Sequence, residues 1–504
     1  HALRILRNKM DDIIDAVKPG CTHGLYDTLN EEETAALKEV TAMGYPPEAW
    51  IQYKFMGDGS LSVLAPTVGK IDGSYYEDFW TKEGYLGYDQ NGTAVRDRIQ
   101  MDTVITDFYA PSEGEIAAEH AYRKKTEEEF DGRNGVDDSW KKMVSAAEGQ
   151  PWIKVADPFP GENPYLTGLK ITITDGEAKG NDMQLGYYED GKIYLGTNFG
   201  SLSANDILRK IKVGDRVHFD NSNYIAIQTY HRHQVPEREY KVWDQFRNPD
   251  GTPKYPQRNI LLCYGFASSG CGSLQSGDFH GKMICLSSLA DDSAFPWMAD
   301  WYRQKVKQAK GLEGEESFRL WYNEHCCHGP QYYSVDETTV TSYGPALYQA
   351  LLDVSDWVER GIEPAQSTQY TVDDGQVIIE AEAKKRKGIQ PVIKLLANGA
   401  ERTCVKVGEP VEFQARITMP EHAGFVTVAD LTFDGKPAFG DECQMKLENQ
   451  GKSATVTASH AYKEAGTYFA TIRVKASRDG NRVDKFTQIQ NIAMARVVVE
   501  DSAK

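Results

Sequence analysis

The chain has 504 residues, which predicts about three domains and enough apolar sequence for a large core. A formal net charge of −18 at pH 7 argues against nucleic acid and anionic membrane surfaces as partners. No apolar run approaches the ~20 residues of a membrane span, and eight cysteines without a CxxC pair do not form a disulfide scaffold.

Residues 1–150 combine helical patterns with an aromatic-rich stretch. Residues 1–17 carry one apolar stripe and predict an amphipathic helix that ends before Gly20. Asn30 and Glu33 have capping-box spacing at the start of a second helix, and residues 59–64 are interpreted as a glycine-rich strand. The aromatic residues between 75 and 88 either form a cap over a pocket or belong to the core.

Residues 151–235 change to alternating polarity with glycine turns, which predicts a β-rich insertion, a small barrel or sandwich. The insertion ends in a polar stretch that contains His231 and His233. Three roles stay open for these two histidines: a hydrogen-bonded loop, contact with a substrate, or metal ligation.

Residues 236–372 contain a strand, an acidic loop, a helix, a second strand and a histidine loop. Asp291 and Asp292 follow the first strand, at 283–287, and His325 and His328 follow the second, at 318–322. Catalytic groups of open α/β sheets lie beyond the carboxyl ends of strands. We therefore expect an acid and a histidine to meet at one sheet edge.

This order resembles the last third of an α/β-hydrolase, in which the acid precedes the catalytic histidine. The spacing of Asp292 to Pro296 is similar to the family's acid turn, and His328-Gly329 is similar to its histidine turn. A helix over 345–360, continued by the phrase Trp357 to Pro364, resembles the closing helix of tannase-like and feruloyl-esterase-like hydrolases.

The resemblance implies a carboxylic-ester hydrolase that needs no cofactor and acts on a small-molecule ester through an acyl-enzyme. His328 would be the base of a Ser-His-Asp triad, with His325 as its competitor or a pocket-lining residue. Asp292 is preferred as the acid on its spacing, and Asp291 is the alternative. His325, His231 and His233 are the candidate substrate-binding residues.

The nucleophile is missing from this scheme, because no Gly-x-Ser-x-Gly pentapeptide occurs in the chain. Cys271 in a glycine-rich loop is the nearest substitute, but serines stand at 269 and 273 where the motif needs glycines, and only eleven residues separate it from the acid strand. The stripe on residues 1–17 also has no earlier strand to cover. We therefore expect a companion N-terminal segment or chain that carries the serine and completes the sheet.

Two other functions stay open. His231, His233, His325 and His328 are a candidate zinc cluster for a metal-dependent hydrolase, to which Cys326 or Cys327 would add a thiolate. Alternatively, the chain is a non-catalytic binding or scaffold protein on a hydrolase frame, which would account for the missing nucleophile motif.

After a linker at 373–390 with a solvated basic run at 384–387, residues 391–504 show period-two patterning that predicts a β-sandwich. The phrase His460 to Tyr468 resembles the signature of polycystic-kidney-disease-type (PKD) domains, in which the tyrosine closes a corner between strands. That resemblance implies a secreted, periplasmic or cell-envelope location. Cys404 and Cys443 both lie in this region and are a candidate disulfide.

Overall fold

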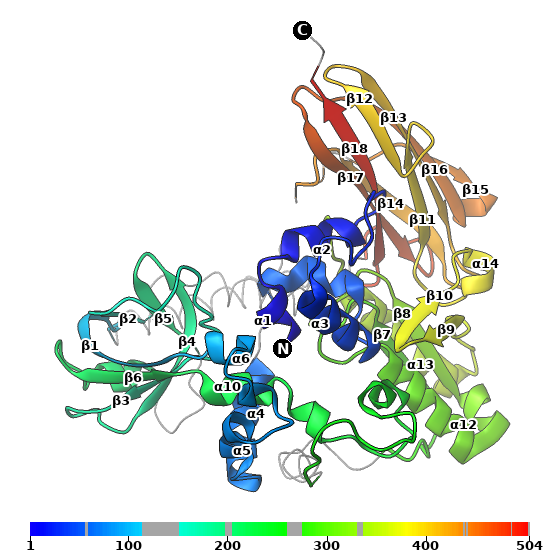
Figure 1. The fold of residues 1–504 in the computed structure, drawn as a ribbon. Helices are drawn as coiled ribbons and strands as arrows, with labels where there is room; N and C mark the ends of the chain where they lie inside the picture. The colour runs from blue at the N-terminus through cyan, green and yellow to red at the C-terminus, as the bar shows by residue number, and fades with distance from the viewer. Residues whose placement is uncertain are drawn as a thin grey trace. The chain divides into compact units, whose positions relative to one another are not determined.

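The computed structural model of the protein describes residues 1–55, 59–112, 151–196, 204–259, 275–329, 336–436, 439, 442–484 and 486–501. These residues belong to two compact units, whose elements are labelled in Figure 1. The first unit comprises residues 1–5 and the stretches described between 59 and 259, and the second comprises residues 6–55 and those from 275 onward. Within this part of the chain no helix is both long and apolar enough to cross a membrane.

The first unit contains a closed barrel of six antiparallel strands. Their order around the barrel is β1 (Gln100–Tyr109), β2 (Trp152–Val155), β5 (Lys192–Leu195), β4 (Asp182–Glu189), β3 (Lys170–Ile173) and β6 (Arg216–Asp220). Alternate side chains fill the interior, together with Ile207 and Leu208 from helix α9 (Ala204–Leu208). The β-rich insertion is thus a barrel, but its first strand precedes the predicted boundary at 151.

Outside the barrel, the described part of this unit contains short helices: α4 (Gly59–Ile71), α5 (Tyr75–Thr81), η2 (Leu86–Tyr88), α6 (Thr93–Arg96), α10 (Ser222–Ile227), η3 (Tyr230–His233) and η4 (Lys241–Phe246). The strand predicted at 59–64 is wrong, because α4 begins there. Leu61, Leu64 and Val68 recur at helical spacing and pack in one apolar cluster. The aromatic stretch supplies core side chains to the same cluster, among them the fully buried Tyr75 and Phe79.

The N-terminal stripe is divided between two helices, α1 (Ala2–Leu6) and α2 (Met10–Val17), with a break at residues 7–9. In the second unit α2 packs against η1 (Pro47–Phe55), and the predicted capping box is present on α3 (Glu31–Ala42). Leu6, Met10 and Ile13 are fully buried within this chain. An uncovered stripe is therefore no longer a reason to expect a companion segment.

The second unit contains the predicted strand–helix–strand module. Strand β7 (Met283–Ser288) pairs in parallel with β8 (Phe318–Asn323), and α12 (Trp297–Ser317) connects them. Helix α13 (Gly344–Arg360) packs on β7 and ends at Gly361, whose φ of 68° is left-handed, as a helix-terminating glycine requires. In the described residues this sheet has two strands, and nothing confirms an α/β-hydrolase fold.

A hairpin of β9 (Tyr370–Asp373) and β10 (Gln376–Ile379) and the short helix α14 (Ala383–Arg386) occupy most of the predicted linker. The basic run is not wholly solvated, because Arg386 is buried and paired with Glu324. The linker is therefore ordered structure that packs on the loop after β8.

The C-terminal β-sandwich is confirmed. One sheet has the order β11 (Val392–Ala397), β13 (Pro410–Thr418), β16 (Ser453–Ala461) and β15 (Met445–Glu448), and the other has β12 (Arg402–Lys406), β18 (Ile489–Glu500), β17 (Gly466–Ser477) and β14 (Phe425–Thr432). The Tyr462 hydroxyl donates to the Phe433 carbonyl at 2.8 Å, which ties two strand ends together as predicted. Cys404 and Cys443 are free thiols.

Candidate functional site

The loops that follow β7 and β8 lie beside each other because the strands are parallel and in register, with Ser288 opposite Asn323. Backbone hydrogen bonds continue the pairing past the strand ends. The amide of Leu289 donates to the Asn323 carbonyl at 2.8 Å, and that of Ala290 donates to the Cys326 carbonyl at 3.0 Å. This local geometry brings the acidic loop to the histidine loop.

Asp291 and His328 form a hydrogen-bonded pair where the two loops meet. The His328 Nδ1 atom lies 3.0 Å from Oδ1 and 3.2 Å from Oδ2 of Asp291. The backbone amides of Ser293 and Ala294 donate to Asp291 Oδ1 at 2.9 and 2.7 Å and fix the carboxylate. A carboxylate in this position requires a proton on Nδ1, so in the neutral imidazole Nε2 is the basic atom.

The environment of the pair favours an imidazole that readily accepts a proton. The hydrogen bond that His328 donates to Asp291 raises the pKa of His328 above its ordinary value, while partial burial opposes the change and the charges of Asp291 and Asp292 add to it. Asp291 has 11% of its side chain exposed and His328 has 53%. The acid is thus enclosed and the base is accessible.

Asp292, which its spacing to Pro296 favoured, does not make the contact with the imidazole. Its recorded side-chain hydrogen bond is a long one, 3.5 Å, from the hydroxyl of Ser293. Burial raises the pKa of Asp292, which is the reverse of what a charged partner of His328 requires. The carboxylate that orients the imidazole is therefore that of Asp291 and not that of Asp292.

A pocket of about 330 Å³ adjoins the pair. Asp291 and His328 are at its polar part, and most of the remaining lining is apolar, with Leu286, Phe295, Met298, Tyr343 and Leu347. Cys285 also lines it, but burial raises the pKa of its thiol to about 11, so it is not an activated thiolate. Sequence reasoning missed these lining residues because they come from β7, from α12 and α13 and from the residues just before these helices, and periodicity alone does not show which faces converge.

His325 has a structural contact. Its Nδ1 lies 2.8 Å from Oδ1 of Asn491 on β18, and its carbonyl accepts from the amide of Thr341 at 2.7 Å. It adopts a left-handed φ of 57°. Among the described residues it does not line the pocket beside His328, so its expected contact with substrate has no geometric support.

His231 and His233 belong to the first unit. His233 is buried, stacks on Tyr85 with ring centres 4.3 Å apart, and lies 2.7 Å from the Pro256 carbonyl through Nδ1. Burial lowers its pKa to about 4. His231 packs edge-on against Phe246. These contacts give both histidines a packing role within the first unit.

The two histidine pairs of the zinc hypothesis belong to different compact units, so their meeting stays a prediction. Burial raises the pKa of the Cys327 thiol, which disfavours the thiolate that zinc requires. In the part of the chain that the structure describes, one group of three has metal-ligating atoms within 4.8 Å of each other, and it consists of Asp15, Cys21 and His23 rather than these histidines. Asp15 is already paired there with Arg496.

Cys271, the substitute nucleophile considered from sequence, lies outside the described residues. Ser287 and Ser288 line the pocket beside the pair, but they end strand β7 and have no nucleophile-elbow sequence. The source of a nucleophile is thus not identified by the described residues.

Comparison with known proteins identifies one module. The PKD domain family matches residues 395–489, which make up most of the C-terminal sandwich. No curated protein matches the chain. Two crystal structures of the major pilin subunit BcpA of Bacillus cereus, one of them a point variant, are 13% and 12% identical with TM-scores of 0.14. The matches cover 22% and 26% of this chain and 40% and 48% of the two pilin chains. Similarity at this level indicates nothing about the function of this chain.

Proposed function

We propose that the chain is the acid- and base-bearing part of a carboxylic-ester hydrolase. The observation that carries the proposal is the hydrogen bond between His328 Nδ1 and the fixed carboxylate of Asp291, beside a largely apolar pocket. In triad hydrolases a carboxylate orients the imidazole through Nδ1, and Nε2 then acts as the base. The resemblance of His328-Gly329 to the histidine turn of that family points the same way, whereas the spacing that resembles the acid turn belongs to Asp292.

In the proposed reaction, Nε2 of His328 accepts the hydroxyl proton of a serine as its oxygen attacks the ester carbonyl. Asp291 keeps the imidazole oriented and stabilises the imidazolium. His328 then protonates the departing alkoxide as the tetrahedral intermediate collapses to the acyl-enzyme. In the second half, a water attacks the acyl carbonyl and gives a proton to Nε2 of His328. As this tetrahedral intermediate collapses, His328 returns the proton to the serine oxygen and the carboxylic acid is released. The apolar lining suits the acyl group.

The serine is proposed to come from a companion segment, upstream in the same precursor or on a separate chain. This rests on the absence of a nucleophile pentapeptide from the chain. The PKD module is the basis for proposing a secreted or envelope location, because the resemblance implies such modules on secreted and surface proteins.

The test uses the chain expressed together with the segment encoded immediately before it. Initial rates of p-nitrophenyl butyrate hydrolysis are measured for the unaltered protein, His328→Gln, Asp291→Asn and the control Asp292→Asn. We expect His328→Gln to lower kcat by at least about 100-fold, with an unchanged thermal transition, and Asp292→Asn to have little effect. Equal activity of His328→Gln and the unaltered protein would refute the proposal. Absence of turnover in every form would exclude a catalytic serine in that upstream segment and leave a separate chain or the non-catalytic binding protein.

A further inference from the structure

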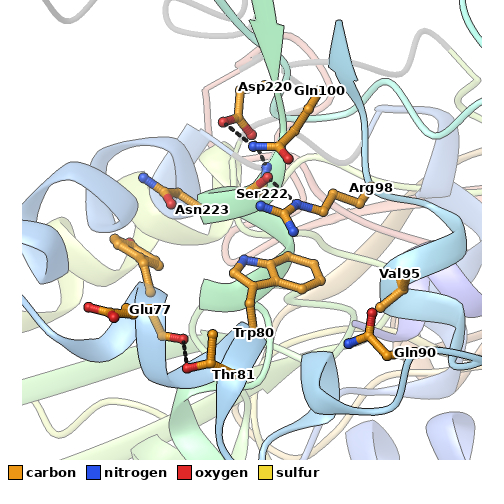
Figure 2. Close-up of a pocket in the computed structure, with 11 residues that line it drawn as sticks. Glu77, Trp80, Thr81, Gln90, Val95, Arg98, Gln100, Asp220, Ser222 and Asn223 are labelled. Atoms are coloured by element: carbon orange, nitrogen blue, oxygen red, sulfur yellow. Dashed lines mark hydrogen bonds between the residues drawn. The ribbon is translucent and has the colours of Figure 1, made fainter.

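A second pocket, of about 490 Å³, lies within the first unit and does not involve Asp291 or His328. Figure 2 shows it between helix α5, the start of β1 and the start of α10, with Arg98 reaching over Trp80 toward Ser222. Most of its lining is polar: the charged residues are Arg98, Glu77 and Asp220, and the amides are Gln90, Gln100 and Asn223. A pocket with several convergent polar groups is a candidate binding site.

Two contacts hold the Arg98 side chain in place. Its Nε donates to the hydroxyl of the buried Ser222 at 2.7 Å, and the guanidinium carbon lies 4.2 Å from the ring centre of Trp80. In the described residues, neither terminal amino group of Arg98 has a hydrogen-bond acceptor. The indole N–H of Trp80 is also buried without an acceptor there. Unpaired donors therefore gather on one side of the pocket.

The nearby Asp220 does not use these donors. Its Oδ1 accepts from the backbone amide of Ser222 at 2.6 Å, and its Oδ2 accepts from the Gln100 amide at 3.3 Å and lies 3.9 Å from Nε2 of His218. Burial lowers the pKa of Arg98, and the negative charge of Asp220 only partly opposes this. A bound anion would offset the cost of burying this cation.

We propose that this pocket binds the carboxylate of a small hydroxylated acid, with the terminal amino groups of Arg98 as its carboxylate-binding groups. A guanidinium presents parallel N–H donors that match a carboxylate, and here its plane is already fixed before binding. The exposed amides of Gln90, Gln100 and Asn223 supply both donors and acceptors for hydroxyl groups. The acid is either a sugar acid or a hydroxylated ring acid without a sugar. This site stands independently of the proposed hydrolase.

The experiment is isothermal titration calorimetry on the full chain with D-galacturonate, D-galactose and quinate as probes. Galactose keeps the hydroxylated ring of galacturonate but lacks its carboxylate. We expect at least one of the two acids to bind about tenfold or more tightly than galactose. Galacturonate alone identifies a sugar acid, and quinate alone identifies a ring acid of the other kind.

Two variants connect binding to Arg98. Arg98→Gln removes the charge, and Arg98→Lys keeps the charge but loses the planar pair of amino groups, so both should weaken binding of the acid about tenfold or more. Arg98→Lys serves if Arg98→Gln fails to show the thermal transition of the unaltered protein. The matched control is Arg96→Gln, an exposed arginine two residues away that does not line the pocket. Binding of neither acid, equal binding of galactose, or unchanged binding in a folded Arg98 variant would overturn the proposal.

Discussion

Replacing Asp291 with asparagine tests the pairing with His328 more directly than any activity assay. An asparagine retains an oxygen that accepts the amides of Ser293 and Ala294, which now donate to Asp291 Oδ1 at 2.9 and 2.7 Å. The turn should therefore persist while the negative charge beside His328 Nδ1 is lost. The change separates the electrostatic role of the carboxylate from its role in the loop.

The expected effect is modest because His328 has 53% of its side chain exposed, so solvent screens the pair. We estimate the interaction with protonated His328 at about 1 kcal/mol, and its loss should lower the pKa of His328. The pKa of His328 in the folded protein is raised. This stabilisation is therefore fully present below the unfolded value near 6.5 and is lost as the pH rises through the folded pKa. Asp291→Asn should be less stable than the unaltered protein at pH 5 and nearly equal to it at pH 9.

The assay is a pH titration of the His328 ring resonances by NMR, assigned with His328→Gln, together with urea unfolding at pH 5 and 9. Asp292→Asn is the matched control, because Asp292 adds a smaller electrostatic contribution and is not hydrogen-bonded to the imidazole. It should lower the pKa of His328 less than Asp291→Asn does. An unchanged pKa in Asp291→Asn, or a larger fall in Asp292→Asn, would show that the pairing is assigned wrongly.

Three further predictions concern stability. Arg258→Gln should destabilise the protein by about 3 kcal/mol in urea unfolding, because it leaves the enclosed carboxylate of Asp72 without its cation and leaves Asp78 with Lys82 alone, and a cost below about 1 kcal/mol would contradict this. His233 has its pKa lowered to about 4, so stability should fall by up to about 3 kcal/mol between pH 6.5 and 4, and a folded His233→Gln variant with the same pH dependence would refute this. Residues 391–504 expressed alone should show one cooperative thermal transition with β-type circular dichroism. An unfolded product would show that these residues are not an independent domain.

Local patterns were sufficient where a structure depends on neighbours in sequence. The sequence correctly predicts the capping box of Asn30 and Glu33, the helix over 345–360 and the alternating C-terminal strands. These features depend on hydrogen bonds and on a spacing of apolar residues that extend over only a few positions. The same locality explains the error at 59–64. A short apolar run fits either a strand or a helix until its packing partners are known.

The sequence by itself determined that an acid and a histidine would each follow a strand, and that a PKD-type sandwich would end the chain. Only the tertiary structure decided that Asp291 rather than Asp292 faces His328, because adjacent side chains leave the backbone in different directions and spacing does not choose between them. The tertiary structure also forms the pocket around Arg98, whose hydrogen-bond partner Ser222 is 124 residues away in the sequence. No local pattern encodes such a contact, since it depends on how the first barrel strand and α10 are brought together by the fold.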